Sequence, residues 1–375
     1  MAQLSEQKIL DSLKGIIDDD KGQDIVSLKM VSGVQIKDGH VAFAIEVDPA
    51  RGAQMEPLRK KAEKAVHALP GVISATVVLT AENTSETTQP SQNAPAGPRG
   101  GDQQEAPLLP GVKSIIAVAS GKGGVGKSTT AVNLALALAA DGHTVGVLDA
   151  DIYGPSIPRM LGISGEPASS DGRTLDPMEN HGVKCMSMGF LVEEETPIIW
   201  RGPMVQSALQ QMMRDVNWGE LDVMVVDMPP GTGDVQLTMA QQVPITGAII
   251  VSTPQDIALA DARKGLNMFR KVDVPVFGVI ENMSYFTCPH CGERSEIFSH
   301  GGARKEAELV SMDFLGEIPL DIAIRETSDN GNPIVVSQPE SEHAKAFRAI
   351  GANIWKKIEK ALAKSKAAAP KITVH

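Results

Sequence analysis

The residues best suited to chemistry lie in one glycine-rich segment, Gly121–Ser128, between two apolar stretches. The run before it, Ile115–Ala119, has the pattern of a buried parallel strand, and the run after it, 129–138, reads as a helix. Glycines let backbone N–H groups close around an anion, and a helix N-terminus adds the positive end of its dipole. This context predicts a phosphate-binding loop made of Gly121, Lys122, Gly123, Gly124, Val125, Gly126, Lys127, Ser128 and Thr129.

Three side chains in and near this loop match the needs of a nucleotide with its magnesium ion. The Lys127 ammonium would reach the β- and γ-phosphates, and the Ser128 hydroxyl would bind Mg²⁺. Asp227 closes the apolar run 223–226, and an aspartate at the end of a buried strand beside a phosphate loop is the other expected contact of Mg²⁺. Asp151 follows a further apolar run in the corresponding place. We prefer it to Asp149 because it lies one step past the strand, where the loop opens.

A second kind of chemistry is indicated by the pair Cys288 and Cys291, which lies in the turn CPHCG. The C-x-x-C spacing brings two thiolates to one metal, yet tetrahedral zinc and cubane iron–sulfur clusters both need about four ligands. Two copies of the pair, related by a twofold axis, would supply that number, which predicts a homodimer with the metal at its interface. A zinc knuckle that uses His290 or His300 is the alternative. A thioredoxin-type redox pair fits less well, because the following residues read as a turn and not as a helix.

The elements that must position these residues alternate along the chain. From Val112 onward, short apolar strands alternate with helical stretches, which predicts an α/β fold with a mainly parallel, doubly wound sheet. The acidic and glycine-rich motifs all fall at the carboxyl ends of strands, where ligands gather in such sheets. The expected strands cover 115–119, 144–148, 183–188, 222–226, 248–252, 276–281 and 314–318. The expected organisation is a small α-β-β-α-β domain at 1–81, a flexible linker at 82–110, a P-loop domain at 111–363 and a disordered tail at 364–375.

Composition argues against several classes of protein. A net charge of −11 and an aromatic content of 3% argue against a nucleic-acid partner, and no run approaches the length of a membrane span. The basic amphipathic stretch 354–362 fits packing on its own domain better than a membrane surface, so we expect no stable membrane association. Three cysteines, an odd number, and no signal peptide indicate a reducing compartment, and we expect a cytoplasmic protein. Cys185, on a predicted internal strand, reads as a small buried side chain.

Several of these motifs together resemble a known family. The doubled-lysine loop GKGGVGKST, the segment DMPPGTGD that begins at Asp227 and the CPHCG turn resemble the Mrp/ApbC iron–sulfur carriers. That group is one of the deviant Walker A ATPases, which also include MinD and ParA. Residues 1–81 are similar to the small DUF59 domain. The resemblance therefore covers nearly the whole chain.

The resemblance implies an ATP-hydrolysing carrier that holds a [4Fe–4S] cluster at a homodimer interface. Such a carrier receives the cluster from upstream donors and passes it to apoprotein clients. It also implies that Lys122 reaches the partner's nucleotide, that Asp151 orients the attacking water beside Mg²⁺ and that Asn282 bonds the adenine edge. For Asn282, a simple turn-forming role stays open. The alternatives are a MinD- or ParA-like positioning ATPase, which would not need the cysteines, and a zinc-binding scaffold whose assembly is driven by ATP.

Overall fold

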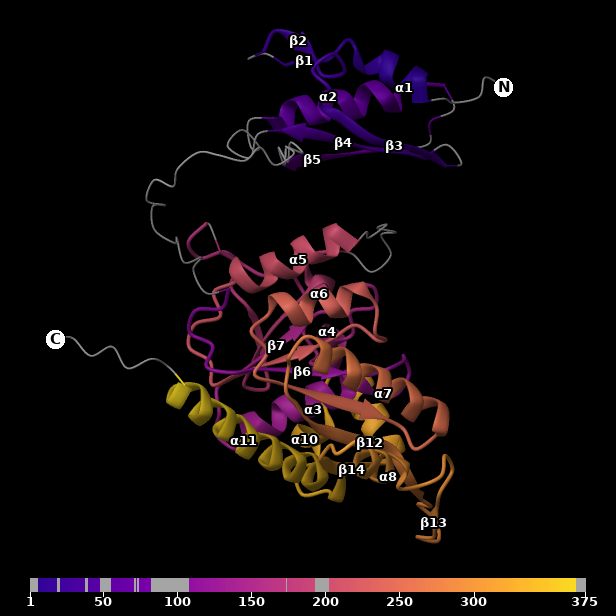
Figure 1. Ribbon diagram of the computed structural model, residues 1–375, viewed down its shortest axis with the longest axis vertical. Helices are drawn as coiled ribbons and strands as arrows, with labels where there is room; N and C mark the ends of the chain where they lie inside the picture. The colour runs from indigo at the N-terminus through magenta and orange to yellow at the C-terminus, as the bar shows by residue number, and fades with distance from the viewer. Residues whose placement is uncertain are drawn as a thin grey trace, which may run out of the picture. The chain divides into compact units, whose positions relative to one another are not determined.

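A computed structural model describes residues 6–18, 21–37, 40–47, 55–70, 72, 74–81, 108–172, 174–192 and 202–368. The chain divides into two compact units, residues 1–101 and 102–375, shown together in Figure 1. Each unit is described by itself. Most of the expected linker, 82–107, lies outside the described residues.

The first unit is a small α+β fold whose three-stranded sheet mixes both strand directions. β3 (Val31–Lys37) pairs antiparallel with β4 (His40–Val47), and β5 (Ser74–Ala81) lies parallel to β4. Figure 1 shows α2 lying along this sheet. Its core consists of apolar side chains from both helices and the sheet, among them Ile9, Leu13, Phe43, Ile45, Ala62 and Val66. The remaining elements are α1 (Glu6–Leu13), α2 (Glu56–His67) and a short ribbon of β1 (Ile17–Asp18) and β2 (Gln23–Asp24).

The second unit is built on a sheet in which seven strands run parallel, in the order β14-β12-β11-β6-β10-β7-β9. β8 pairs antiparallel at one edge, and β13 pairs antiparallel with the far end of β12. The central strands are buried on both faces, as their apolar, β-branched sequences predict. The strands are β6 (Ile115–Ala119), β7 (Val145–Asp149), β8 (Met178–Asn180), β9 (Val183–Ser187), β10 (Val223–Asp227), β11 (Gly247–Ser252), β12 (Val276–Thr287), β13 (Arg294–Ser295) and β14 (Phe314–Leu320).

Helices cover this sheet on both faces, which confirms the predicted α/β class. α3 packs with α11 over the sheet, while α7 and α8 enclose a separate apolar cluster with β11, β12 and β14. Figure 1 shows these two groups on different sides of the strands. The helices are α3 (Lys127–Ala140), α4 (Ile157–Met160), α5 (Gly202–Arg214), α6 (Asp234–Gln242), α7 (Asp256–Lys271), α8 (Gly302–Leu309), α9 (Ile322–Asp329), α10 (Ile334–Ser337) and α11 (Glu342–Ala368).

Two elements are longer than their sequence patterns suggested. β12 does not end at Glu281 but continues to Thr287, where Phe286 and Thr287 pair with β13. α11 runs to Ala368, so residues 364–368 are helical although the sequence assigned them to a tail; residues 369–375 lie outside the described residues. None of the helices in the described part of the chain combines the length and the apolar composition needed to cross a bilayer.

The apolar side of α11 packs into the main core. The basic stretch 354–362 therefore packs on its own domain, as the sequence predicted. Ile354 and Ile358 are fully buried, and Phe347, about two turns earlier, is 1% exposed. Trp355 lies against the core and stacks on His143, with 3.6 Å between the ring centroids. The helix therefore supports α3, whose first residue is the P-loop lysine, Lys127.

We predict that Phe347→Ala lowers the free energy of unfolding by about 3–5 kcal/mol, because it leaves a cavity between α11 and the sheet. Denaturant unfolding of the purified chain measures this value. The matched control on the same helix is the exposed Asn353→Ala, which we expect to change stability by less than about 0.5 kcal/mol. Equal effects of the two substitutions would show that α11 is not part of the core.

Candidate nucleotide and thiol sites

The backbone of the predicted phosphate loop needs glycine at particular positions for two different reasons. Gly124 and Gly126 adopt left-handed φ angles of 79° and 78°, which other residues rarely adopt. A Cβ added to Gly126 would lie 2.2 Å from Asn282 Nδ2, and one added to Gly121 would lie 2.2 Å from the backbone of Asp261. The loop thus passes too close to its neighbours for any side chain at these points, and Gly126 directly precedes α3.

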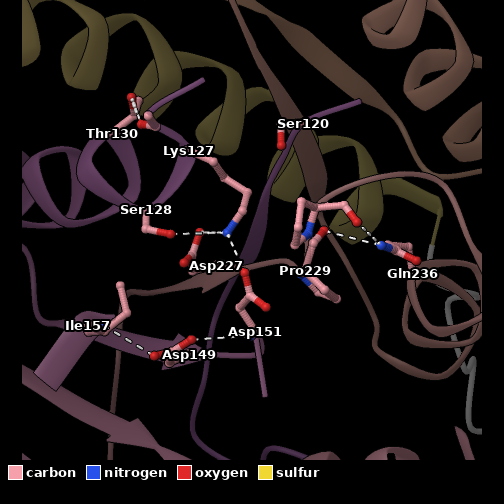
Figure 2. Close-up of polar contacts among 12 residues, drawn as sticks. Ser120, Lys127, Ser128, Thr130, Asp149, Asp151, Ile157, Asp227, Pro229 and Gln236 are labelled. Carbon is pink, nitrogen blue, oxygen red and sulfur yellow. Dashed lines mark hydrogen bonds and ion pairs between the residues drawn. The ribbon is translucent and has the colours of Figure 1, made fainter. Parts of the chain in front are cut away.

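The Lys127 ammonium lies at the centre of a nearly enclosed polar site (Figure 2). Its Nζ is 2.6 Å from Asp227 Oδ1, 3.7 Å from Asp151 Oδ2 and 3.2 Å from Ser128 Oγ. Lys127 is 7% exposed, Asp151 15% and Asp227 fully buried. The structure therefore brings together the loop lysine, the loop serine and the two aspartates that the sequence singled out, from residues up to 100 positions apart in the chain.

Burial dominates the electrostatics of the aspartates around Lys127. Asp149 and Asp227 end neighbouring strands and are register partners in the β7–β10 pair. Burial, followed by the charge of Asp227, raises the pKa of Asp149 to about 7. Burial also raises the pKa of Asp151 and of Asp227, and in both cases the Lys127 charge opposes this effect. The site concentrates negative charge that a bound cation would relieve.

The donor set fits a magnesium ion. Asp227 Oδ2 is buried and has no hydrogen-bond partner among the described residues, although Oδ1 of the same carboxylate contacts Lys127. Ser128 is the second residue of α3, and its hydroxyl oxygen lies 3.2 Å from the Lys127 ammonium. Hard oxygen ligands of this kind, one carboxylate and one hydroxyl, are those that Mg²⁺ takes from a protein when phosphates and water complete its shell.

Asp149 and Asp151 have different surroundings. Asp149 accepts hydrogen bonds from the backbone N–H of Asp151 at 3.2 Å, from the N–H of Ile157 at 3.3 Å and from the Ser187 hydroxyl at 2.9 Å. It therefore fixes both ends of the loop 150–157 and ties that loop to β9. Asp151 keeps its carboxylate directed toward Lys127 (Figure 2). Sequence spacing did not reveal this supporting role of Asp149, which depends on Ser187 from a distant strand.

The loop after β10, 228–233, is held against the phosphate loop by its own backbone. Met228 N donates to Val118 O at 3.0 Å, and Gly231 N, at a φ of 97°, donates to Ser120 O at 3.0 Å. Gln236 Nε2 donates to Pro230 O at 2.5 Å (Figure 2). Gln236 could not be singled out from the sequence, because a glutamine on a helix is common and only the fold brings it to Pro230.

Asn282 and Lys122 lie at opposite ends of the loop and differ in their contacts. Asn282 is 8% exposed, and its Nδ2 donates to Val125 O at 2.8 Å, so that its amide supports the phosphate loop from β12. Lys122 is half-buried; Ser120 Oγ donates to its carbonyl at 2.9 Å. Its ammonium makes no ion pair within the part of the chain that the structure describes. The adenine contact of Asn282 and the role of Lys122 across a dimer stay predictions.

Cys288 and Cys291 lie at the tip of a hairpin formed by the end of β12 and by β13 (Figure 1). The turn is closed by Cys288 N donating to Glu293 O at 2.9 Å and by Gly292 N, at a φ of 74°, donating to Cys288 O at 2.8 Å. The N–H groups of Cys291 and His290 lower the pKa of the Cys288 thiol by hydrogen bonding to its sulfur. Cys288 is partly exposed and Cys291 exposed, whereas Cys185 is buried as expected. The turn thus places two thiol groups near one another at the surface.

His300 is engaged elsewhere. Its Nε2 lies 2.9 Å from Glu317 Oε2, and Glu281 completes a group whose ligand atoms all lie within 4.8 Å of one another. Across the described residues, no group of three His, Cys, Asp or Glu side chains at such distances includes Cys288 or Cys291. Among the described residues of the chain, the cysteine pair therefore lacks the further protein ligands that a zinc knuckle needs.

Comparison with known proteins gives a consistent result for both units. A ParA-type family model described as the NUBPL iron-transfer P-loop NTPase matches residues 111–355, and a model described as an iron–sulfur cluster assembly protein matches residues 6–77. The chain is 45% identical over 363 residues to the iron–sulfur cluster carrier protein of Synechocystis. The aligned region covers 96% of this chain and 99% of that protein. It is 57% identical over 253 residues to the mouse iron–sulfur cluster transfer protein NUBPL, which covers 67% of this chain and 79% of that protein.

The chain is also similar to solved structures. The nucleotide-binding protein of Archaeoglobus fulgidus, in complex with ADP, is 40% identical, with a TM-score of 0.56 over 64% of this chain and 94% of that chain.

We predict that the buried carboxyls make the nucleotide-free chain less stable as the pH rises from about 4 to about 7. In this window the folded state keeps protons that the unfolded chain has released, because burial raises the pKa of Asp149 from 3.8 to about 7. Since the folded state then binds more protons, the free energy of unfolding falls with pH and levels off above the folded pKa. Urea unfolding at several pH values measures this slope.

Asp149→Asn should make that slope shallower, whereas Asp273→Asn, at an exposed turn before β12, should leave it unchanged. A slope that is the same in both variants would contradict the assignment.

Proposed function

Because this chain belongs to the ParA-type family of iron-transfer P-loop NTPases, we propose that it is an ATP-hydrolysing carrier of a [4Fe–4S] cluster. The cluster is held between two copies of the chain and transferred to apoprotein clients. The observation that carries this proposal is the exposed cysteine pair at the tip of the β12–β13 hairpin, which no third ligand completes within the described chain. Two such pairs supply the four thiolates that a cubane cluster takes.

The residues around Lys127 account for the nucleotide half of the function. A triphosphate bound by the loop would compete with Asp227 for the Lys127 ammonium, which lies only 2.6 Å from that carboxylate. Asp227 and Ser128 would hold Mg²⁺, which supplies positive charge to the phosphate oxygens. Asp151, held in place through its N–H by Asp149, orients the attacking water. Lys122 stabilises the developing charge on the partner's nucleotide, as a positive group supplied in trans.

The hairpin accounts for the carrier half. The lowered pKa of Cys288 favours the thiolate, which is the form that binds iron. The exposure of Cys291 leaves the cargo open to thiols of a client protein, so that ligands can be exchanged one at a time. Donor proteins can load the same exposed tip.

We predict that the protein, isolated anaerobically after reconstitution, contains one four-iron cluster per two chains. Cys288→Ala and Cys291→Ala should each abolish iron binding, because a dimer of either variant keeps only two of the four thiolates that a cubane cluster takes. Iron and sulfide analysis, absorption spectroscopy and sedimentation measure these quantities. The matched control is Cys185→Ala, which removes a buried thiol and should leave the cluster in place.

A monomer that stays free of iron would contradict the carrier proposal. Zinc in a thiolate site, at one ion per two chains, would instead support the zinc scaffold. Nucleotide-dependent sedimentation with liposomes or DNA, unaffected by the cysteine substitutions, would support a positioning ATPase.

We predict that Lys122→Ala lowers the hydrolysis rate by about 10³-fold or more, while nucleotide binding changes little, because the lysine acts on the partner's site. Lys127→Ala should abolish binding at its own site. Mixing the two inactive variants should restore about a quarter of the wild-type rate: about half of randomly formed dimers are mixed, and each mixed dimer has one complete site. Steady-state ATP hydrolysis measures this, with mixed dimers verified by mass spectrometry. No recovery in verified mixed dimers would place Lys122 in its own site.

A further inference from the structure

We propose that Asn282 and Met283, in the middle of β12, are positioning residues that couple the phosphate loop to the cysteine hairpin. The proposal rests on the proposed function in one respect, that Cys288 and Cys291 carry the cargo. β12 passes beside the phosphate loop at Asn282 and reaches the cysteine turn six residues later. A single strand therefore touches both sites.

The contact with the phosphate loop is close and enclosed. Asn282 Nδ2 donates to Val125 O at 2.8 Å, and the asparagine side chain is 8% exposed. The position of an added Cβ at Gly126 is 2.2 Å from this nitrogen and 3.8 Å from Met283 Cε. Because Gly126 immediately precedes Lys127, any shift of the loop that accompanies phosphate binding must move against these two side chains.

The neighbours of these two residues are fixed from the other side. The Glu281 carboxylate accepts hydrogen bonds from Gly301 N at 2.9 Å and from Ala303 N at 2.7 Å, which ties β12 to the start of α8. Ser284 Oγ contacts Glu281 Oε1 at 2.5 Å and Glu317 Oε2 at 3.3 Å, which ties it to β14. Anchored at 281 and 284, the strand has little freedom to absorb a shift at 282 and 283 by sliding as a whole.

The backbone between the anchors is strained. Met283 has a φ of 55°, in the left-handed region that a methionine rarely occupies. The pairing of β12 with β14 changes register between Asn282 and Phe286, so the ladder is interrupted at this point. A residue held in an unfavourable conformation by packing is a place where a small push selects a different backbone geometry.

The consequence reaches the thiols. Beyond Met283, β12 continues to Phe286 and Thr287, which pair with β13, and then to Cys288. A change of direction at Met283 reorients this hairpin and alters the access of solvent and client to both cysteines. If the bound nucleotide changes the affinity of the cysteines for a cluster by some factor, thermodynamic linkage requires that the cluster change the affinity for that nucleotide by the same factor.

The test measures the alkylation rates of Cys288 and Cys291 in the full-length, metal-free protein, with MgADP and with a non-hydrolysable MgATP analogue. Mass spectrometry follows each cysteine, and the buried Cys185 reports unfolding. We expect the two nucleotides to give rates that differ by about fivefold or more, at the lower end of typical allosteric coupling. In Met283→Gly, which accepts the left-handed φ without strain, the ratio should fall to near one.

Asp273→Gly is the matched control, because Asp273 has a φ of 57° in the turn just before β12 and gives the same relief of strain away from the phosphate loop. It should keep the wild-type ratio. Thermal unfolding and nucleotide affinity of both variants verify that they fold and bind. Equal rates with both nucleotides in the wild type, a ratio preserved in Met283→Gly, or a ratio lost in both variants would each overturn the proposal.

This readout needs no cluster, so it separates the two proposals. A nucleotide-dependent ratio in a chain that binds no iron would uphold the coupling and refute the carrier function. The opposite result would be a protein that binds and transfers a cluster while neither the transfer rate nor the alkylation rates of the cysteines depend on nucleotide. That result would support the carrier function and refute the coupling.

Discussion

One buried ammonium holds the nucleotide site together. Lys127 lies among the carboxylates of Asp151 and Asp227, with that of Asp149 beside them, where burial alone would force protons onto the acids. The lysine compensates part of this charge, and it can do so only because Gly126 allows the chain to turn sharply into α3. The strand ends, the loop 150–157 that Asp149 holds through hydrogen bonds, and α3, against which α11 packs, together keep these charges at contact distance. Since attraction between charges is strong where water is excluded, a phosphate group entering this site meets a cation that is already positioned.

The second site obeys a different constraint, since it lies at the surface. Cys288 and Cys291 lie on a hairpin that leaves the sheet, so the fold gives them hydrogen-bond donors and a turn but, among the described residues, no third metal-ligating side chain. The fold therefore combines an enclosed polar site around Lys127 with an open thiol pair at the surface. β12 is the element common to both, because it contacts the loop at Asn282 and ends at the cysteines.

Much of the fold followed from sequence pattern alone, because buried parallel strands such as Val223–Asp227 have continuous β-branched runs that few other elements share. The loop residues Lys127 and Ser128 were identifiable because their glycine context is specific. What the sequence did not reveal depends on partners far along the chain. Asp149 links the loop 150–157 to β9 by accepting a hydrogen bond from Ser187. Asn282 supports the phosphate loop by donating a hydrogen bond to the carbonyl of Val125. The extension of β12 to Thr287 was missed for a similar reason, because it depends on the pairing of Phe286 and Thr287 with β13.

The turn that carries the cysteines keeps its shape through backbone hydrogen bonds of its own, from Cys288 N to Glu293 O and from Gly292 N to Cys288 O. These two bonds join backbone atoms and involve neither sulfur, so the gain or loss of a metal on the thiols need not break them. A turn that keeps its shape without a cluster could release one cluster and take up the next without refolding. This property suits the carrier function proposed above better than it suits a protein that binds one metal permanently.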